Sequence, residues 1–535
     1  MEFQSYAYGT NHWLADPDLR AVLERVWPEV TAHEAELAAF GALAGREAYE
    51  VAYHVDHDAP PVLVNFDLDG ERVDRVRLSP AERDLLQRLA PMMRPPFEGG
   101  SWHHHFAQGY LLADPGLYCV LTITLQTAYA LHKYAPEQRQ LETSLLALEA
   151  FGATWMTETQ GGSDLGANRT VASRRASGWR LSGGDKYFAS GAGLADVAIV
   201  TARPEGAPAG PKGLALFLVP RLDAAGSLNF RVRRLKDKSA TRAVPSGEVE
   251  LEDSHAELIG VAGEGIYYTL ETLTVSRLAN AVASMGIARK AALEVEERVR
   301  RRSAFGRVLA EHPLVRRDLL ELAVRQAGGL ALAFHAVDAF DKAWHDRPPY
   351  SDAYHYARFL GYLAKNRTAD HAADVSRLAM ELFGGLGFLE EAAVARWHRE
   401  ALITPIWEGP SNIQALDMLE VMQKKAAHRT FVADMRALLQ AVDEPEARLA
   451  ESALGSALAS LEGRPDEEAQ WLAKDVLAQL ADVAQVALLY ALDRTRGGRY
   501  AKLARLYASR FLAHEPFPTW ALGDPDLWPA VAPGA

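Results

Sequence analysis

The sequence predicts a mainly α-helical protein with a central β-domain. Helical periodicity fills the first part of the chain, short β-prone pieces with many glycines occupy the middle, and long helical patterns then return. A chain of 535 residues is also too long for a single core. We therefore expect an N-terminal helical domain, a middle β-domain, a helical bundle and an extra helical domain, at residues 1–152, 153–262, 263–427 and 428–535.

The first domain is expected to be helical from about Asp16, because apolar residues recur at helical spacing over 19–27 and 118–131. Between about Ala153 and Gly260, four β-prone pieces follow one another without a dozen helical residues between them. This arrangement favours a small antiparallel sheet or barrel over a parallel nucleotide-binding sheet. The four pieces are 197–201, 214–219, 230–233 and 248–251.

Long helical patterns resume at Tyr267 and continue to about Lys425. Glycines and prolines interrupt them at 312–313, 348–349, 384–385 and 405, which predicts four or five helices with short joints, typical of a four-helix bundle. A further helical segment, rich in alanine and leucine, follows a changeover near 426–430 and forms the predicted C-terminal extension.

Composition excludes several classes of function. The formal net charge of −13 argues against a surface that binds nucleic acid or anionic lipid over its whole area. Cys119 is the single cysteine, so no disulfide can form within the chain, and a reducing, cytoplasmic location is expected. Because no run of about 18 consecutive apolar residues occurs, we expect no membrane partner.

Glu408 stands between large apolar residues and a Gly-Pro turn, in the stretch from Ile406 to Asn412. A carboxylate beside Ile406 and Trp407 is expected to lose solvation, which favours its neutral form and suits a base that takes a proton from carbon. The alternative is an ordinary glutamate that points to solvent, and the local pattern alone favours that alternative.

The stretch 157–164 reads Thr-Glu-Thr-Gln-Gly-Gly-Ser-Asp and joins the first two predicted domains. Two adjacent glycines let backbone amides approach an anion closely, and Thr157 and Ser163 offer hydroxyl groups. The pattern suits a loop that holds a pyrophosphate or the edge of a flavin. A polar interdomain loop is the alternative, and spacing alone favours it.

Three other patterns are weaker evidence for a functional site. Residues 191–196 are similar to a dinucleotide fingerprint, but Asp196 ends the pattern and a strand follows where a helix is needed. The run 103–105 offers three histidines, but adjacent side chains diverge and no acidic partner is suitably spaced, so we interpret it as a solvated or hydrogen-bonded cluster and expect no metal site. The stretch 302–306, Arg-Ser-Ala-Phe-Gly, is by itself typical of a basic helix end with a glycine cap.

Taken in order, five motifs make the chain resemble the acyl-CoA dehydrogenase family over roughly residues 100 to 425. They are the stretches 157–164, 186–190 (Lys-Tyr-Phe-Ala-Ser), 302–306, 383–388 (Phe-Gly-Gly-Leu-Gly-Phe) and 406–409 (Ile-Trp-Glu-Gly). Within the family, the chain is most similar to the AidB-like, alkylation-response branch. That likeness rests on Arg-Leu-Lys-Asp-Lys at 234–238, on Met156 before the first motif, and on the long C-terminal extension.

The resemblance implies an FAD-dependent oxidoreductase that oxidises an acyl-CoA thioester at its α and β carbons. Glu408 matches the base that takes the α-proton, and flavin N5 accepts the β-hydride. The backbone amide of Glu408 and a flavin hydroxyl would stabilise charge on the thioester oxygen. An electron-transfer flavoprotein or another acceptor would reoxidise the flavin, and the family's usual assembly is a homotetramer.

The resemblance also assigns positions around the cofactor and the substrate. Arg277 matches an arginine near CoA, although Thr274 replaces the acidic residue that usually lies three positions earlier. Pro410 replaces a threonine and so lacks a hydroxyl and an amide hydrogen for the flavin, and Glu381 replaces a glutamine. The residues that match the FAD site are Thr157, Ser163, Phe188, Ser190 and Asn412, with Arg302, Phe305, Gly384 and Gly385 from a neighbouring subunit.

The C-terminal extension supplies a second hypothesis. Between 490 and 512 the sequence has six basic residues and one acidic residue, Asp493. At about 100° per residue, several of the basic residues fall within one arc of a helix. Such a stripe suits phosphates, and AidB-like proteins are associated with DNA binding and protection from alkylation. The alternative function is therefore a flavoprotein that binds double-stranded DNA and has weak dehydrogenase activity. The stripe consists of Arg494, Arg496, Arg499, Lys502, Arg505 and Arg510.

Overall fold

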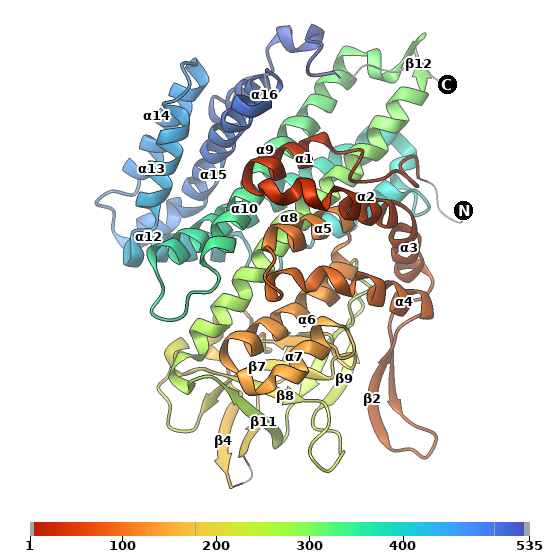
Figure 1. The fold of residues 1–535 in the computed structure, drawn as a ribbon, viewed down its shortest axis with the longest axis vertical. Helices are drawn as coiled ribbons and strands as arrows, with labels where there is room; N and C mark the ends of the chain where they lie inside the picture. Colours follow the sequence, from red (N-terminus) through yellow and green to blue (C-terminus); the bar gives the residue numbers. More distant parts are fainter. Residues whose placement is uncertain (1–4, 177, 497, 529–535) are drawn as a thin grey trace. The chain divides into compact units, whose positions relative to one another are not determined.

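The structure is a computed structural model that describes residues 5–176, 178–496 and 498–528 (Figure 1). The chain divides into two compact units, which we call the bundle unit and the sheet unit. The bundle unit comprises 1–46, 101–113 and 277–535, and the sheet unit comprises 47–100 and 114–276. The last boundary falls within helix α8 (Gly265–Arg301). The predicted division into four domains follows sequence segments and stays a prediction.

In the sheet unit, apart from the first part of α8, the α-helices come from the first 152 residues. They are α3 (Tyr49–His57), α4 (Pro80–Leu89), α6 (Pro115–Tyr134) and α7 (Arg139–Leu146). Asp114 starts α6 by accepting a hydrogen bond from the Leu117 amide at 3.1 Å, and most side chains of α6 are buried.

The sequence analysis missed a hairpin in this helical stretch, formed by β1 (Val62–Phe66) and β2 (Arg72–Arg77). The pairing is antiparallel, with Leu63 opposite Val76. Four apolar residues, interrupted by Asn65, are too short a run to distinguish a strand from a piece of helix by periodicity. The Asp69-Gly70 pair was the available signal, since Gly70 adopts φ +81° in the turn.

The predicted small barrel is present. Strand β7 pairs with β4 on one side and β8 on the other, and β5 and β11 complete a closed ring of five strands. Strand β3 adds to β7 outside the ring. Two of these pairings, β7 with β3 and β7 with β4, are parallel, whereas the sequence predicted antiparallel pairing only. The strands are β3 (Gly152–Trp155), β4 (Val171–Arg175), β5 (Gly178–Ser182), β7 (Val197–Pro204), β8 (Ala215–Pro220) and β11 (Ser254–Ile259).

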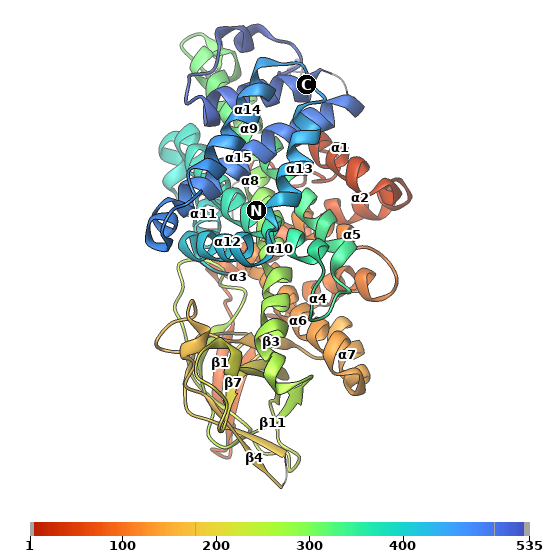
Figure 2. The same cartoon turned by 90° about the vertical axis from the view of Figure 1, so that its left-hand side faces the viewer.

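A separate antiparallel sheet has the order β6, β10, β9. Its strands are β6 (Lys186–Ser190), β9 (Arg231–Leu235) and β10 (Ser246–Glu250), and all four β-prone pieces of the sequence fall in or overlap strands. The apolar core between the two sheets includes Trp155, Phe217 and Phe230, with the Trp155 and Phe230 rings 4.8 Å apart and perpendicular. Figure 2 shows the strands of this unit together.

In the bundle unit, the long helices end where the sequence predicted breaks. Helix α9 (Pro313–Ala343) begins at the predicted proline, and α10 (Asp352–Phe383) ends immediately before the double glycine. The helices α9 and α10 pack along each other. The remaining helices of this part are α11 (Ala393–Ala401) and α12 (Ser411–Lys425), and α1 (Pro17–Val26), α2 (Glu34–Leu43) and α5 (Trp102–Leu112) also belong to the unit.

The C-terminal extension is part of this core rather than an appendage. It contains α13 (His428–Leu439), α14 (Pro445–Ala459), α15 (Asp466–Arg496) and α16 (Arg499–Tyr507), which lie together in Figure 1. Helix α15 packs against α9, α10 and α12. Over 466–493 it is long and apolar enough to cross a membrane, but 83% of the tested window is buried inside the protein, as in the core helix of a soluble protein.

A buried polar network joins the extension to α10. Arg367 donates two hydrogen bonds to the Asp482 carboxylate at 2.6 and 2.8 Å, and the Tyr507 hydroxyl donates to the same carboxylate at 2.6 Å. His371 contacts Gln485 at 3.1 Å and Tyr507 at 3.0 Å. Burial, with Arg367 and Arg325 nearby, lowers the pKa of His371 well below its usual range, so the ring is neutral.

The buried carboxyl of Glu82 on α4 makes stability depend on pH. Its side chain is fully buried, and neither carboxylate oxygen has a hydrogen-bond partner among the described residues. Burial, helped by the Asp114 carboxylate, raises its pKa from 4.5 to about 8. Because the folded pKa lies above the unfolded one, the stabilising contribution of the neutral carboxyl is complete below the unfolded pKa and is lost as the pH rises through about 8.

We therefore expect Glu82→Gln, which stays neutral, to raise the melting temperature at about pH 9 and to leave it nearly unchanged at about pH 5. The difference in unfolding free energy should be on the order of 4 kcal/mol. Thermal unfolding followed by circular dichroism across this pH range tests it. Glu71→Gln, at an exposed position in the same unit, is the control, and an equal pH dependence in both variants would contradict the prediction.

Candidate functional site

Glu408 and Gly409 form a left-handed turn between α11 and α12. Their φ angles are 58° and 94°, and a positive φ is strained for a residue with a side chain. A Cβ added at Gly409 would lie 2.6 Å from the side-chain nitrogen Nε2 of Gln414, and the φ of 94° would strain any residue with a side chain at this position. The Gly-Pro pair of the sequence motif is therefore needed for the shape of this turn.

The carbonyl groups of this turn are held by side chains from three helices. Arg277 of α8 donates to the Glu408 carbonyl oxygen at 3.1 Å. Gln414 of α12 donates to the carbonyl oxygens of Glu408 at 2.8 Å and Gly409 at 3.1 Å. Lys365 of α10 donates to the Gly409 carbonyl at 2.7 Å and to the Pro405 carbonyl at 3.4 Å. The backbone that carries the Glu408 carboxylate is thus anchored on both sides of the residue.

The ammonium group of Lys365 is almost completely buried, with 1% of the residue exposed. Burial lowers its pKa from 10.5 to about 8, and Arg277 adds to this effect, whereas the negative charge of Glu408 opposes it. The Glu408 carboxylate therefore acts electrostatically on the cation that holds its own backbone.

The immediate neighbours of Glu408 do not behave as the sequence predicted. Ile406 is 62% exposed, and Glu408 is half-buried, so Ile406 does not keep the carboxylate dry. The Trp407 indole N–H donates to the Asn280 side chain, and Asn280 in turn donates to the Thr404 carbonyl at 3.1 Å. Trp407 thus links the loop that carries Glu408 to α8 through hydrogen bonds. The sequence placed Ile406 and Trp407 beside Glu408, but it could not show that Ile406 is exposed whereas Trp407 binds Asn280.

Arg277, which the resemblance placed near CoA, is 4% exposed. Besides the Glu408 carbonyl, it binds the Asp417 carboxylate of α12 at 2.9 Å, and its guanidinium carbon lies 5.0 Å from the centre of the Tyr362 ring. Its contacts position the Glu408 turn, and its assignment to CoA stays a prediction.

Pro410 and Asn412 lie at the beginning of α12. The Pro410 carbonyl accepts hydrogen bonds from the amides of Ile413 at 2.8 Å and Gln414 at 3.1 Å, so proline starts the helix without needing an amide hydrogen of its own. Asn412 is exposed in the first turn. The replacement of threonine by proline therefore suits the turn, whatever it changes for a ligand.

The double glycine follows α10 directly. The buried guanidinium of Arg298 donates to the Phe383 carbonyl at 2.8 Å and fixes the end of that helix. Gly384 has φ +65°, and both glycines are exposed, with no atom within 4 Å of an added Cβ. Glu381, the residue that departs from the family pattern, forms an exposed ion pair with Arg377 at 2.8 Å, which offsets its charge.

Residues 302–306 are not a glycine-capped helix end, as their pattern alone suggested. Helix α8 ends at Arg301, and the short strands β12 (Ser303–Ala304) and β13 (Arg307–Val308) form a hairpin. Phe305 and Gly306 make its turn with φ 52° and 76°. Phe305 is 96% exposed at this tip, and Arg302 is exposed beside it, so the aromatic ring contacts little of its own chain.

In the sheet unit, the predicted cofactor loop is built around a buried ion pair. Glu158 and Lys186 are both fully buried and lie 2.9 Å apart. Glu158 accepts further hydrogen bonds from the Arg169 amide at 2.6 Å and the Thr170 hydroxyl at 2.6 Å, and Lys186 donates to the Thr201 carbonyl at 2.9 Å. Burial opposes ionisation of Glu158, but Lys186 and these hydrogen bonds lower its pKa, so the carboxylate is charged.

This ion pair holds the loop against strand β6. The Tyr187 amide donates to the Thr157 carbonyl at 2.9 Å, and a Cβ added at Gly162 would lie 2.3 Å from the Thr157 hydroxyl oxygen. Gly161 has φ +128°, which L-residues rarely adopt. The two glycines are therefore required by backbone shape and by close approach to Thr157, while Ser163 is exposed.

Strand β6 presents two of the predicted cofactor residues. Phe188 is 54% exposed, with the Lys236 ammonium 4.5 Å from its ring centre, and Ser190 is half-buried. Between them, Ala189 belongs to the apolar core, so Phe188 and Ser190 occupy the opposite face of the strand. Thr157 is half-buried in the loop that pairs with this strand.

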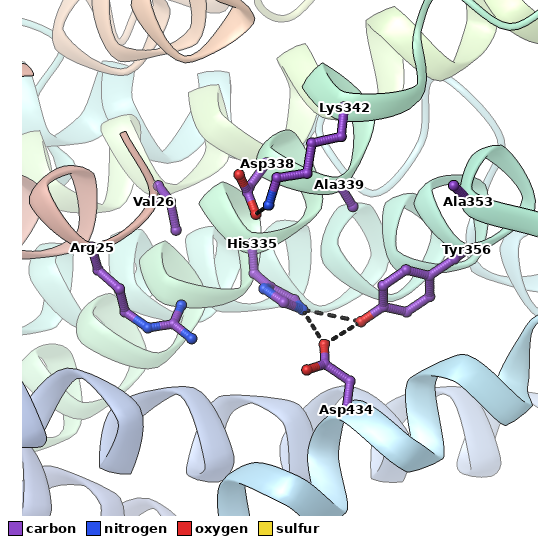
Figure 3. Close-up of a pocket in the computed structure, with 9 residues that line it drawn as sticks. All are labelled: Arg25, Val26, His335, Asp338, Ala339, Lys342, Ala353, Tyr356 and Asp434. Atoms are coloured by element: carbon purple, nitrogen blue, oxygen red, sulfur yellow. Dashed lines mark hydrogen bonds and ion pairs between the residues drawn. The ribbon is translucent and has the colours of Figure 1, made fainter. Parts of the chain in front are cut away.

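A polar pocket of about 410 Å³ lies elsewhere in the bundle unit (Figure 3). His335 contacts Tyr356 at 3.2 Å and Asp434 at 3.1 Å, and Lys342 pairs with Asp338 at 2.6 Å. The pocket thus contains one ion pair, between Lys342 and Asp338, and a hydrogen-bonded group formed by His335, Tyr356 and Asp434. None of the predicted site residues lines it, and we do not assign the candidate site to this pocket.

The basic stripe of the extension is largely neutralised within the chain. Arg499 lies 3.4 Å from Asp18, Lys502 lies 2.8 Å from Asp524, and each is a side-chain ion pair. Arg505 pairs with Glu444 at 2.6 Å, and Arg510 pairs with Glu321 at 3.1 Å. The side chains of Arg494 and Arg496 lie outside the described residues. The described cations therefore have structural partners that the sequence pattern could not reveal.

The functional residues that the sequence analysis missed are Lys365, Gln414, Glu158 and Lys186. Lys365 carried a signal, since it follows the apolar run from 361 to 364 in a helix that had to be buried. Glu158 and Lys186 lay within quoted motifs, but only the fold brings them together.

Comparison with known proteins agrees with this architecture. Three family models match successive parts of the chain, namely the adaptive response protein AidB N-terminal domain at 4–150, the acyl-CoA dehydrogenase middle domain at 153–254 and the acyl-CoA dehydrogenase C-terminal domain at 263–423. AidB of Escherichia coli K12 is 31% identical over 393 residues, which are 69% of this chain and 70% of that protein. The chain belongs to the acyl-CoA dehydrogenase family.

Solved structures of acyl-CoA dehydrogenases extend the likeness over nearly the whole chain. ACDH-11 of Caenorhabditis elegans, solved in complex with C11-CoA, has a TM-score of 0.84 at 26% identity, with 97% of this chain and 94% of that chain covered. An acyl-CoA dehydrogenase of Bacillus anthracis, solved with FAD, shares the fold with a TM-score of 0.69 at 16% identity, covering 96% of this chain and 87% of that one. The expected family, its AidB-like branch and the fold class are confirmed, and the family is one of FAD-dependent oxidoreductases.

In this acyl-CoA dehydrogenase, Lys186→Met is expected to lower the unfolding free energy of the sheet unit by about 3–5 kcal/mol, because Glu158 would stay buried without its partner. Urea unfolding measures the loss. The double variant Glu158→Gln with Lys186→Met should lose less than the single variant. As a control, Lys424→Met breaks an exposed ion pair with Glu420 and should change stability by less than about 1 kcal/mol. Equal losses in Lys186→Met and Lys424→Met would contradict the argument.

Proposed function

We propose that the protein is an FAD-dependent acyl-CoA dehydrogenase in which Glu408 takes the proton from the α-carbon of the acyl chain. The anchored left-handed turn at Glu408 and Gly409 carries this proposal. A general base must be held within hydrogen-bond reach of the proton that it removes, and a turn fixed from three helices meets that requirement. Lys365, Arg277 and Gln414 act as positioning residues, because they bind the backbone of the base.

Charge that develops on the thioester oxygen as the proton leaves needs a hydrogen-bond donor nearby. We assign this role to the backbone amide of Glu408, which is part of the same anchored turn. Base and donor would then share one rigid segment. Closure of the site around an acyl chain would exclude water from the half-buried carboxylate, a task that the exposed Ile406 does not perform alone.

The sheet unit fits a ligand with a planar ring system and a pyrophosphate. Phe188 offers an exposed aromatic surface, Thr157 and Ser190 offer half-buried hydroxyls, and Gly161 and Gly162 shape a loop that ends in the exposed Ser163. We assign these residues, with Asn412, to FAD. When bound, FAD supplies the acceptor for the hydride that leaves the β-carbon.

A second group of FAD contacts would come from a neighbouring subunit. Phe305 is 96% exposed at a hairpin tip, and Gly384 and Gly385 are open to solvent at the end of α10. A large exposed aromatic next to Arg302 suits contact with another chain. We therefore propose a homo-oligomer, with the tetramer of the family as its form.

The substrate is proposed to be an acyl-CoA, in line with the relative solved in complex with C11-CoA. We assign Arg277 to CoA because its position in the sequence matches the arginine that the family places near CoA. An electron-transferring flavoprotein, or another electron acceptor, would reoxidise the enzyme. We propose a cytoplasmic location, because a chain with a single cysteine cannot form an internal disulfide and suits a reducing environment.

The proposal is tested by mixing anaerobic protein with a panel of acyl-CoA thioesters and following the absorbance of oxidised flavin. We expect rapid bleaching with at least one member, slowed by about 10²–10⁴-fold in Glu408→Gln while the FAD content stays the same. Glu420→Gln, an exposed position on α12, is the matched control and should bleach at the wild-type rate. A protein that takes up no FAD, or a Glu408→Gln variant with full activity, would rule out the proposal.

The alternative hypothesis of a DNA-binding flavoprotein is tested separately. Because each described cation of the basic stripe pairs with an acidic side chain, we expect no shift of duplex DNA at about 50 mM salt. An electrophoretic mobility assay measures this. A shift that weakens steeply with salt and is reduced in Arg499→Ala with Lys502→Ala would establish the alternative.

A further inference from the structure

Outside the catalytic turn, two histidines and a glutamate converge at one place in the bundle unit. His33 ends the short 3₁₀ helix Pro28–His33, Glu36 lies in the first turn of α2, and His104 lies on α5. Their ligand atoms all lie within 4.8 Å of one another. The Glu36 carboxylate contacts both rings, with one oxygen 3.0 Å from His104 Nε2 and the other 3.5 Å from His33 Nδ1, and the two ring centroids lie 4.5 Å apart.

The Nε2 atom of His104 is a buried nitrogen that could bind a metal ion. The residue is 7% exposed, and among the described residues Nε2 has no partner with hydrogen-bond geometry, although a Glu36 oxygen lies 3.0 Å away. A buried polar nitrogen left in this state costs stability unless something else satisfies it.

We propose that His33, Glu36 and His104 form a binding site for a divalent transition metal ion such as zinc. Two imidazoles and one carboxylate are the ligand types that zinc and its neighbours prefer, whereas calcium and magnesium prefer oxygen ligands alone. This site goes beyond the proposed dehydrogenase function, which uses none of the three residues.

The surroundings match those of a metal site. Gln108 donates to Glu36 at 3.2 Å, which orients the carboxylate, and such supporting contacts are usual around metal ligands. The Trp27 ring stacks on both imidazoles, with centroids 5.0 Å from His33 and 5.4 Å from His104. Glu36 and His33 are partly open to solvent, so an ion can enter, and water can complete its coordination.

The structure also corrects the interpretation of the histidine run. The sequence predicted a solvated or hydrogen-bonded cluster at residues 103–105. All three histidines are buried, so they are not solvated, but His103 is hydrogen-bonded, with its Nδ1 2.7 Å from the Ser101 hydroxyl oxygen. Adjacent histidines do diverge, as expected, because His103 lies near Asp338 and Asp341 whereas His104 faces Glu36. The acidic partner that spacing could not supply comes from a helix about 70 residues earlier in the chain.

The test uses the full-length protein without an affinity tag, stripped with a chelator and titrated with Zn²⁺ by calorimetry. We expect one saturable site per chain, weakened at least about ten-fold in Glu36→Gln and in His33→Asn. Both positions are partly exposed, so neither variant disturbs the core. Cobalt binding should give a visible absorption band. It should also quench the fluorescence of Trp27, which is the part of the emission that the Trp27→Phe variant lacks.

The matched control is His54→Asn, because His54 forms an exposed pair with Asp58 at 3.3 Å that has no second histidine. It should bind zinc as the wild type does. Absence of saturable binding, or binding that Glu36→Gln and His33→Asn leave unchanged, would overturn the proposal. Because the measurement is metal binding and not turnover, its outcome does not depend on the dehydrogenase proposal.

Discussion

The bundle unit holds its candidate catalytic residue through three donors that bind the carbonyl groups of one strained turn. A residue with a side chain in a left-handed conformation costs about 1–3 kcal/mol, and Glu408 adopts that conformation. Hydrogen bonds that involve a charged group contribute about 1.5–3 kcal/mol each, and the turn receives such bonds from Lys365 and Arg277. The strain is therefore offset locally, and the carboxylate occupies a place that a relaxed loop would not give it.

The sheet unit also has a buried lysine that binds a backbone carbonyl, beside the loop that we assign to FAD. There Lys186 is buried, binds the Thr201 carbonyl and pairs with Glu158, while Lys365 is buried, binds the Gly409 carbonyl and is influenced by Glu408. A buried lysine is costly unless its three protons find acceptors, so each one makes the surrounding backbone intolerant of change. Such lysines explain why the two loops keep their shape although they contain flexible glycines.

Local pattern predicted most of the secondary structure, because helical periodicity and glycine or proline breaks are properties of neighbouring residues. The ends of α9 and α10 and the strands β7 to β10 follow from it. Apart from the hairpin of β1 and β2, what it missed depends on residues far apart in the chain. The parallel pairing of β7, the anchoring of Glu408 by Lys365, and the pairing of Arg505 with Glu444 all join distant segments. The resemblance supplied the family positions, but not the side chains that hold them.

Asp18 of α1 accepts from Tyr500 of α16 at 3.0 Å, and α1 also packs against α9 and α15. The bundle unit is thus closed by contacts between its earliest and its latest helices, whereas the sheet unit is complete by residue 276. During synthesis the sheet unit can fold before translation ends. In contrast, α1 can pack against its partner helices only after nearly the whole chain has been synthesised. Until then its apolar face, with Leu19, Val22 and Leu23, has no final partner, which makes this helix a natural client of chaperones.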